Sequence, residues 1–248
     1  MNLANIRIVM IETSHPGNIG ACARAMKNMG LSQLSLVKPV RFPDEEATAR
    51  ASGASDILEH ANVCDSLAQA LEGCGVVVGA SARRRSITWP EFNPRECAAF
   101  VAPYSDDTEI AIVFGRECSG LRNEELDCCS HLVHIPCNEA FSSLNVAAAV
   151  QVISYELRMQ LLQGNTASDE QTLIDQPATS EELEGMYEQM QQALVEIDFL
   201  DPDKPRKLMR RLRRLYSRTA LERREVNILR GIFSAAQRQA RLGTDRSK

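Results

Sequence analysis

Short apolar runs alternate with helical patterns through the first 163 residues of the chain. The apolar runs predict strands at Ile6–Ile11, Leu34–Val37, Gly75–Gly79, Glu109–Phe114 and Leu132–Ile135. Apolar residues at helical spacing predict helices at Ile19–Met29, Asp65–Leu71, Pro94–Phe100, Asn123–Cys128 and Ser143–Leu162. Strands that alternate with helices predict an α/β fold around a parallel sheet.

The remaining chain has a different character. Residues 164–180 are polar and contain Gly and Pro, which predicts a linker. Beyond them, apolar residues recur at helical spacing on either side of a break at 201–205, and Thr179 with Glu182 fits a capping box. We predict a domain at 1–163 and a small helical module at 181–248.

Charge is divided sharply along the chain. Residues 204–248 hold 15 Lys or Arg and 3 acids, whereas residues 165–203 hold 11 acids and no Lys or Arg. This asymmetry favours a polyanion partner, although a solvated face packed on the acidic helix before it is the alternative. The candidate phosphate contacts are Arg83, Arg84, Arg85, Arg210, Arg211, Arg213 and Arg214.

Several classes of protein are disfavoured. The chain has no apolar run long enough to cross a membrane and no signal-peptide pattern, so we expect a cytoplasmic protein. Its eight cysteines include no C-x-x-C pair, which favours reduced thiols. A metal site is a weak alternative, since no zinc spacing fits the nearby cysteines and histidines at Cys128, Cys129, His131, His134 and Cys137.

The segment "SHPGNIGACAR" (14–24) follows the first predicted strand. Glycines between a strand and a helix can form a phosphate cradle, because backbone amides at a helix start point at an anion. The glycine spacing fits neither of the common nucleotide motifs, so a tight turn with packing glycines is equally compatible.

Two later segments carry candidate site residues. "VFGRECSGL" (113–121) follows a buried strand, where open α/β sheets bind ligands, and Glu117 there either orients a substrate or is a solvated acid. "IPCNEAFSSLN" (135–145) leads into a helix, and Ser142, Ser143 and Asn145 exceed the needs of one N-cap.

Together the three segments resemble the three motifs of the SPOUT superfamily, TrmH-like branch. The matching stretches are Asn18 to Arg24, Phe114 to Gly120, and Ile135-Pro136 with Ser143 to Asn145. The resemblance implies an α/β domain with a trefoil knot near residues 113–160, a homodimer, and S-adenosylmethionine as cofactor, with no metal required.

The resemblance also implies site residues. Arg24 would act as an essential arginine supplied to the partner subunit's site, and the other catalytic positions would be Asn18, Glu117, Ser143 and Asn145. The cofactor contacts would be Ala80, Ser81, Ala82, Gly115, Ile135, Ser142, Ser143 and Leu144.

The activity implied is 2′-O-methylation of cytidine or uridine at nucleotide 32 in the tRNA anticodon loop. Alternatives are a non-catalytic RNA-binding protein of the same fold, or a 2′-O-methyltransferase that acts on a different tRNA or rRNA site. A nucleotide-dependent enzyme that uses the turn at 14–24 for phosphate is a further rival.

Overall fold

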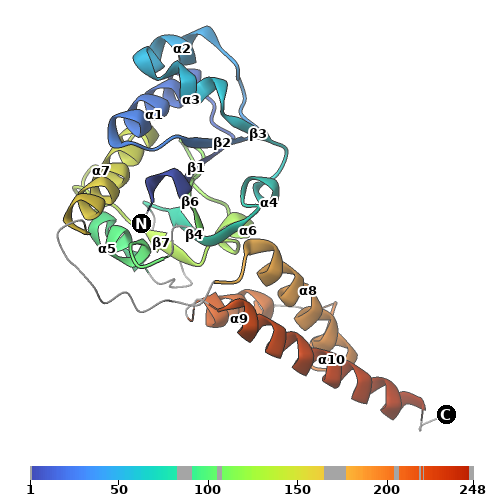
Figure 1. The fold of residues 1–248 in the computed structure, drawn as a ribbon. Coiled ribbons are helices and arrows are strands. Elements are labelled where there is room, and N and C mark those ends of the chain that lie inside the picture. The colour runs from blue at the N-terminus through green and yellow to red at the C-terminus, as the bar shows by residue number, and fades with distance from the viewer. Residues whose placement is uncertain are drawn as a thin grey trace.

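The computed structural model describes residues 2–82, 91–104, 108–164, 177–203, 207–217, 219 and 221–245. The chain forms an α/β part up to residue 164 and a group of helices from residue 177 onward (Figure 1). Arg83, Arg84 and Arg85 and the predicted linker between 165 and 176 lie outside the described residues.

Within the described residues, seven strands form one sheet in which every pairing is parallel. Their order across the sheet is β3-β2-β1-β6-β4-β7-β5. The strands are β1 (Ile6–Ile11), β2 (Gln33–Val37), β3 (Asn62–Cys64), β4 (Cys74–Ala80), β5 (Glu91–Phe92), β6 (Glu109–Phe114) and β7 (His131–Val133). The predicted parallel-sheet α/β class is confirmed, and the knot stays a prediction.

Both faces of the sheet are covered. In β1, Ile8 and Met10 enter the core on one face, and Val9 and Ile11 enter the core on the other. This explains why the strand is an apolar run and not an alternating pattern.

Among the described helices of the α/β part, the longer ones and α3 (Ser55–Glu59) cover the larger core, and two short helices cover the smaller core (Figure 1). The first set comprises α1 (Pro16–Met29), α2 (Glu45–Ala51), α3, α5 (Pro94–Val101) and α7 (Val146–Gly164). The second comprises α4 (Leu67–Ala70) and α6 (Asn123–Leu126). Two short 3-10 turns occur at Leu3–Asn5 and Ser52–Ala54.

Helix α1 packs unusually closely against its neighbour α2. A Cβ atom added at Gly20 would lie 2.0 Å from the carbonyl oxygen of Ala47, which is far inside van der Waals contact. Gly20 is therefore a packing residue, as one of the two alternatives for the turn at 14–24 predicts.

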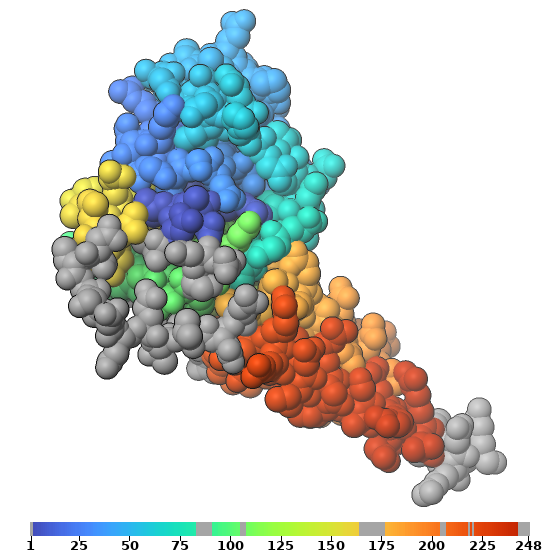
Figure 2. All heavy atoms as spheres, in the orientation of Figure 1, coloured from blue at the N-terminus to red at the C-terminus, as the bar shows by residue number. Residues whose placement is uncertain are grey.

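In the described C-terminal residues the chain forms three helices, α8 (Ser180–Glu196), α9 (Leu208–Ser217) and α10 (Arg223–Asp245). They enclose a small core of their own, which includes Met186, Tyr187, Met190 and Val226. In the space-filling view these helices project from the α/β body as an arm (Figure 2). The side chains of Thr179 and Glu182 form the predicted capping box at the start of α8.

Polar contacts join the arm to the α/β part. Oε1 of Glu181 accepts a hydrogen bond of 2.9 Å from the backbone amide of Gly73. Nε of Arg210 lies 2.9 Å from both carboxylate oxygens of Asp127, in the turn after α6. These contacts hold the start of α8 and the start of α9 against the sheet domain.

The structure corrects some sequence-based boundaries. Helix α7 begins at Val146 and not at Ser143, so the two serines lie in the loop before it. Thr219 and Glu222 also have the spacing of a capping box, but α10 begins at Arg223 and the Thr219 hydroxyl donates to the carbonyl of Tyr216. The strands β3 and β5 and the helices α2 and α3 were not predicted.

All eight cysteines are free thiols, and five of them are buried. In the described parts of the chain no helix is long and apolar enough to span a membrane. Nor do these parts contain a group of three or more His, Cys, Asp or Glu side chains that could hold a metal ion.

Candidate active site

A pocket of about 610 Å³ lies where β4, β6 and β7 end. These strands are neighbours in the order β6-β4-β7, so their carboxyl ends meet at one edge of the sheet. The loops after them and the start of α7 supply the walls. This is the edge at which open α/β sheets bind their ligands.

The pocket brings together residues that are far apart in sequence. Every cofactor contact expected from the family resemblance lines it, and Glu117 and Asn145 line it as well. The expected cofactor contacts are Ala80, Ser81, Ala82, Gly115, Ile135, Ser142, Ser143 and Leu144.

Glycine is required at the entrance to the loop after β6. A Cβ atom at Gly115 would lie 2.2 Å from the carbonyl carbon of Gly120, because the loop folds back on itself. The two backbone hydrogen bonds between Arg116 and Gly120 close this loop, at 3.2 and 2.9 Å. Gly120 adopts a φ of 68°, which L side chains rarely adopt.

The carboxylate of Glu117 occupies the N-terminus of α1. Its oxygens accept hydrogen bonds from the backbone amides of Ser14 (3.2 Å) and His15 (3.4 Å), and from the Ser14 hydroxyl (3.1 Å). Nδ2 of Asn18 donates a further hydrogen bond of 3.1 Å. The turn that resembled a phosphate cradle therefore binds an anion from the same chain.

This environment determines the charge of Glu117. Partial burial raises its pKa, but the hydrogen bonds from Asn18 and from the Ser14 and His15 amides outweigh burial and lower the pKa below its ordinary value. Glu117 is thus a carboxylate at neutral pH. It is suited to orient hydrogen-bond donors and poorly suited to take up a proton.

Asn145 has two roles. Its Oδ1 accepts a hydrogen bond of 2.9 Å from the backbone amide of Ala147, and so caps α7. Its Nδ2 donates to Oδ1 of Asn18 at 3.0 Å. The start of α7, the start of α1 and the loop after β6 are therefore connected through Asn145, Asn18 and Glu117.

Arg24 is exposed on α1, two turns beyond the helix start, and does not line the pocket of its own chain. Among the described residues it forms no ion pair and no side-chain hydrogen bond. The structure therefore leaves its guanidinium available to a second molecule.

The basic residues of α9 do not all face solvent. Arg210 pairs with Asp127, and Arg213 pairs with Glu184 and lies 4.5 Å above the ring of Tyr187. Arg211 is exposed, while Arg214 is half-buried. Of the seven predicted phosphate contacts, the four on α9 therefore include two that are paired with acids of the same chain.

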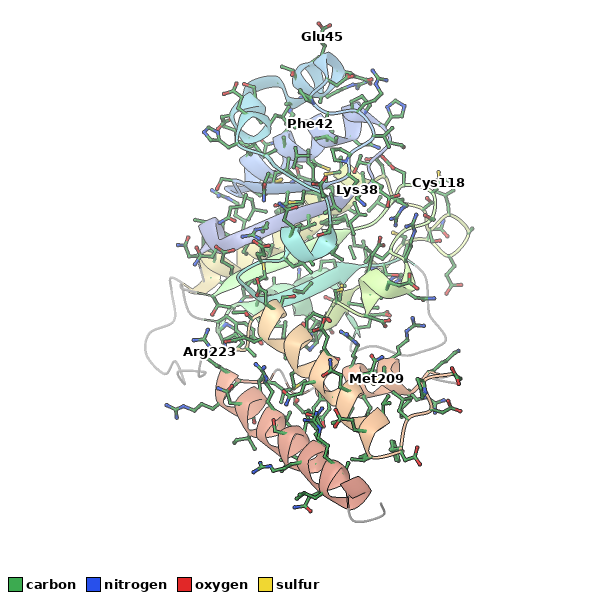
Figure 3. All side chains as sticks on the ribbon, turned by 90° about the vertical axis from the view of Figure 1, so that its right-hand side faces the viewer. Lys38, Phe42, Glu45, Cys118, Met209 and Arg223 are labelled. Atoms are coloured by element: carbon green, nitrogen blue, oxygen red, sulfur yellow. The ribbon has the colours of Figure 1, made fainter. Side chains whose placement is uncertain are left out.

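Sequence reasoning missed some residues that line the pocket, among them Arg116, Cys118 and Cys137. Cys118 is exposed at the edge of the α/β part, far from Met209 and Arg223 of the C-terminal helices (Figure 3). Arg116 could have been noticed because it is a charged residue two positions after the buried strand β6, in a short loop that begins at Gly115 and ends at Gly120.

His131 belongs to an aromatic cluster. Its ring lies 5.2 Å from that of Phe92 and 4.3 Å from that of Phe100, between centroids. Burial lowers its pKa to about 4, so the imidazole is neutral at physiological pH.

Comparison with known proteins agrees with this architecture. The model of the SpoU rRNA Methylase family matches residues 5–155, and the model of the tRNA methyltransferase TrmJ, C-terminal domain, matches residues 181–245. The chain is 54% identical over 247 residues to the tRNA (cytidine/uridine/adenosine-2'-O-)-methyltransferase TrmJ of Pseudomonas aeruginosa (strain UCBPP-PA14), with 96% of each chain covered.

Solved structures are similar over most of the chain. TrmJ from Z. mobilis ZM4 is 30% identical with a TM-score of 0.80, covering 92% of this chain and 97% of that one. A probable methylase family protein from Haemophilus influenzae Rd KW20 is 45% identical with a TM-score of 0.66, covering 98% and 100%. These matches confirm the sequence-based resemblance: the chain belongs to the SpoU methylase family and carries a TrmJ-type C-terminal domain.

Proposed function

We propose that this protein transfers a methyl group from S-adenosylmethionine to the ribose 2′-hydroxyl of cytidine or uridine at nucleotide 32 of the tRNA anticodon loop. The observation that carries the proposal is that one pocket gathers all the expected cofactor contacts with Glu117 and Asn145. The printed activity of the Pseudomonas relative supports tRNA as substrate and the 2′-hydroxyl as acceptor. A tRNA substrate implies a cytoplasmic protein.

The pocket suits S-adenosylmethionine in size and chemistry. Its volume lies in the range of pockets that hold drug-sized ligands. Ile135 and Leu144 provide apolar walls for a purine ring, and the 80–82 and 115–120 loops offer backbone groups for the polar parts. The bound cofactor supplies a sulfonium methyl group that is already activated, so the reaction requires alignment and not a metal.

The residues around the pocket orient the acceptor. Glu117 fixes Asn18, and Asn18 in turn fixes Asn145 at the start of α7. Ser143, in the loop just before α7, adds a hydroxyl on the same wall. These groups hold the ribose so that its 2′-hydroxyl faces the methyl group.

A second copy of the chain completes the site. Helix α7 exposes Val152, Tyr155 and Leu162, spaced along the helix at positions that share one face. Helix α1 lies beside it, and Arg158 of α7 donates a hydrogen bond to the carbonyl of Met29. A homodimer formed through this surface buries the apolar side chains and brings Arg24 to the partner's pocket.

In the partner's pocket, Arg24 acts through its positive charge. A guanidinium stays protonated at any physiological pH, which excludes it as a conventional base. The guanidinium binds a tRNA phosphate and stabilises the negative charge that develops on the ribose 2′-oxygen.

The C-terminal helices and the three arginines at 83–85 bind the tRNA backbone. Arg211 and Arg238 are exposed, and no acid among the described residues pairs with either. Arg214 lies on the same helix as Arg211, and Arg83, Arg84 and Arg85 follow the strand β4 that borders the pocket. Contacts of this kind give affinity that falls steeply with salt and reads little sequence.

The experiment that tests the proposal is mass-spectrometric mapping of 2′-O-methyl groups in total tRNA, incubated with the protein and S-adenosylmethionine. New methyl groups are expected at nucleotide 32 in the wild-type reaction and are expected to be lost with Arg24→Ala. Substrates that carry C, U or A at nucleotide 32 define the accepted bases.

Three outcomes contradict the proposal. Methylation at another nucleotide, or in rRNA only, means a different target for the same chemistry. Calorimetry that detects no binding of S-adenosylhomocysteine means a non-catalytic RNA-binding protein. Binding of NAD or ATP in place of S-adenosylhomocysteine means a nucleotide-dependent enzyme.

A further inference from the structure

Arg116 connects three segments around the pocket. Its Nε and Nη2 lie 2.8 and 2.6 Å from the two carboxylate oxygens of Glu12, directly after β1. Its Nη1 and Nη2 lie 3.0 and 2.8 Å from the carboxylate of Glu125 in α6. The Arg116 side chain is only 12% exposed. Its largely buried guanidinium therefore forms charge-assisted hydrogen bonds with the carboxylates of both Glu12 and Glu125.

The residue that Arg116 holds after β1 has an uncommon backbone. Glu12 adopts a φ of 45°, a left-handed conformation that side chains other than Gly and Asn rarely adopt. Such conformations persist where the surroundings determine them, and they cluster at functional sites. Glu12 lies just ahead of the Ser14 and His15 amides that bind Glu117.

Arg116 and Glu117 are adjacent residues of the 115–120 loop, and each attaches this loop to a different part of the α/β domain. The Arg116 side chain joins the loop to the end of β1 and to α6. The next side chain, Glu117, joins it to the start of α1 and to Asn18. The loop that these two residues fix is also a wall of the pocket.

We propose that Arg116 is a positioning residue of the methyl-transfer site, which holds the 115–120 loop so that Glu117 meets Asn18 and the cofactor wall keeps its shape. The inference rests on the proposed function, since it assigns a role within that reaction. A planar fork that binds two carboxylates at once cannot be replaced by the single ammonium group of lysine.

The test compares Arg116→Lys and Arg116→Gln with Arg122→Gln. Arg122 is a matched control, because it also pairs with Glu12, at 3.5 Å, but its side chain is 60% exposed. Both variants at 116 are expected to weaken S-adenosylhomocysteine binding and to lower kcat by roughly tenfold or more, with KM for tRNA little changed. Arg122→Gln is expected to stay within about twofold of wild type, as usual for an exposed pair.

Hydrogen exchange gives a readout that does not depend on activity. Amides in segments 14–18 and 115–122 are expected to exchange faster in Arg116→Lys, while those of β2 and β7 keep their protection. Turnover and cofactor affinity of folded Arg116→Lys within about twofold of wild type, with unchanged exchange in these segments, would overturn the inference. A wild-type protein that binds cofactor but methylates no tRNA would contradict the proposed function alone, because exchange and binding still report on Arg116.

Discussion

The side-chain amide of Asn145 donates a 3.0 Å hydrogen bond to Oδ1 of Asn18, although 127 positions separate the two residues. Asn145 also caps α7 through its other side-chain atom, Oδ1. One residue therefore stabilises a helix and fastens that helix to the network of Asn18 and Glu117. The two roles can be separated by substitution.

Asn145→Ser is expected to keep the cap and lose the bond to Asn18, since a serine hydroxyl is too short to serve both. The free energy of unfolding should change by only a few tenths of a kcal/mol, whereas Asn145→Ala should lose about 1 kcal/mol. Urea unfolding measures stability, and methyl transfer to tRNA measures the site. Activity of Asn145→Ser equal to wild type would show that the bond to Asn18 is dispensable.

A mixture of two inactive variants tests whether Arg24 acts across the dimer. Arg24→Ala retains an intact pocket, and Asn145→Ala retains the arginine. After subunit exchange, a one-to-one mixture is expected to recover about a quarter of the wild-type activity, because half of the dimers then hold one complete site. No recovery, despite exchange shown by mass spectrometry, would place Arg24 in its own chain's site.

The negative charge of Glu117 predicts a dependence of stability on acid. Its pKa in the folded protein lies below the ordinary 4.5, so the unfolded chain takes up the proton first as the pH falls. The stabilisation is present above pH 4.5 and is lost as the pH falls through the lowered folded value. Urea unfolding between pH 6 and pH 3 should therefore show a steeper loss for wild type than for Glu117→Gln. Parallel curves would mean that the carboxylate contributes nothing at the start of α1.

His131 predicts a second loss of stability on acidification, which begins at a higher pH than the loss due to Glu117. The folded protein keeps the imidazole neutral down to about pH 4, whereas the unfolded chain protonates it below 6.5. Between these two values the free energy of unfolding should decrease as the pH is lowered, and His131 should contribute up to about 1.4 kcal/mol per pH unit to this decrease. In His131→Asn the slope between pH 6.5 and pH 5 should be smaller by that amount. An unchanged slope would show that His131 titrates normally in the fold.

Arg210 and Arg211 are neighbours with different expected roles. Arg210→Gln leaves the partly buried Asp127 without its partner, and the expected cost is about 1–2 kcal/mol, below that of a fully buried pair. Arg211→Gln should leave stability unchanged, weaken tRNA binding and reduce its salt dependence by about one unit of slope. Unfolding curves and filter binding at several salt concentrations distinguish the two. Equal effects of both substitutions on tRNA affinity would mean that Arg210 also contacts RNA.

The elements that the sequence predicted well are those with strong local signals. The apolar runs at Ile6–Ile11 and Glu109–Phe114 became strands with the same bounds, because central parallel strands are buried on both faces. The short edge strands β3 and β5 were missed. Val63 of β3 is largely exposed, and β5 spans only Glu91–Phe92, so neither carries a clear apolar pattern.

The site shows a similar division. The motif resemblance identified pocket residues on three separate loops, which no local pattern could have brought together. The partners of Glu117 could not be predicted, because the Ser14 and His15 amides meet it only after β1 and β6 become neighbours. For the same reason, charge counting treated Arg210 and Arg213 as free cations, although folding pairs both with acids.

The missing side chain at Gly20 has a consequence for the partner subunit. Gly20 allows α1 to approach Ala47 so closely that a single methyl group would push the helix outward. Arg24 lies one turn further along the same helix. How far the proposed trans-acting arginine extends toward the partner's pocket therefore depends on the packing of α1 within its own subunit, which requires that Gly20 has no Cβ atom. Selection for activity in one protomer would then act on the packing of the other.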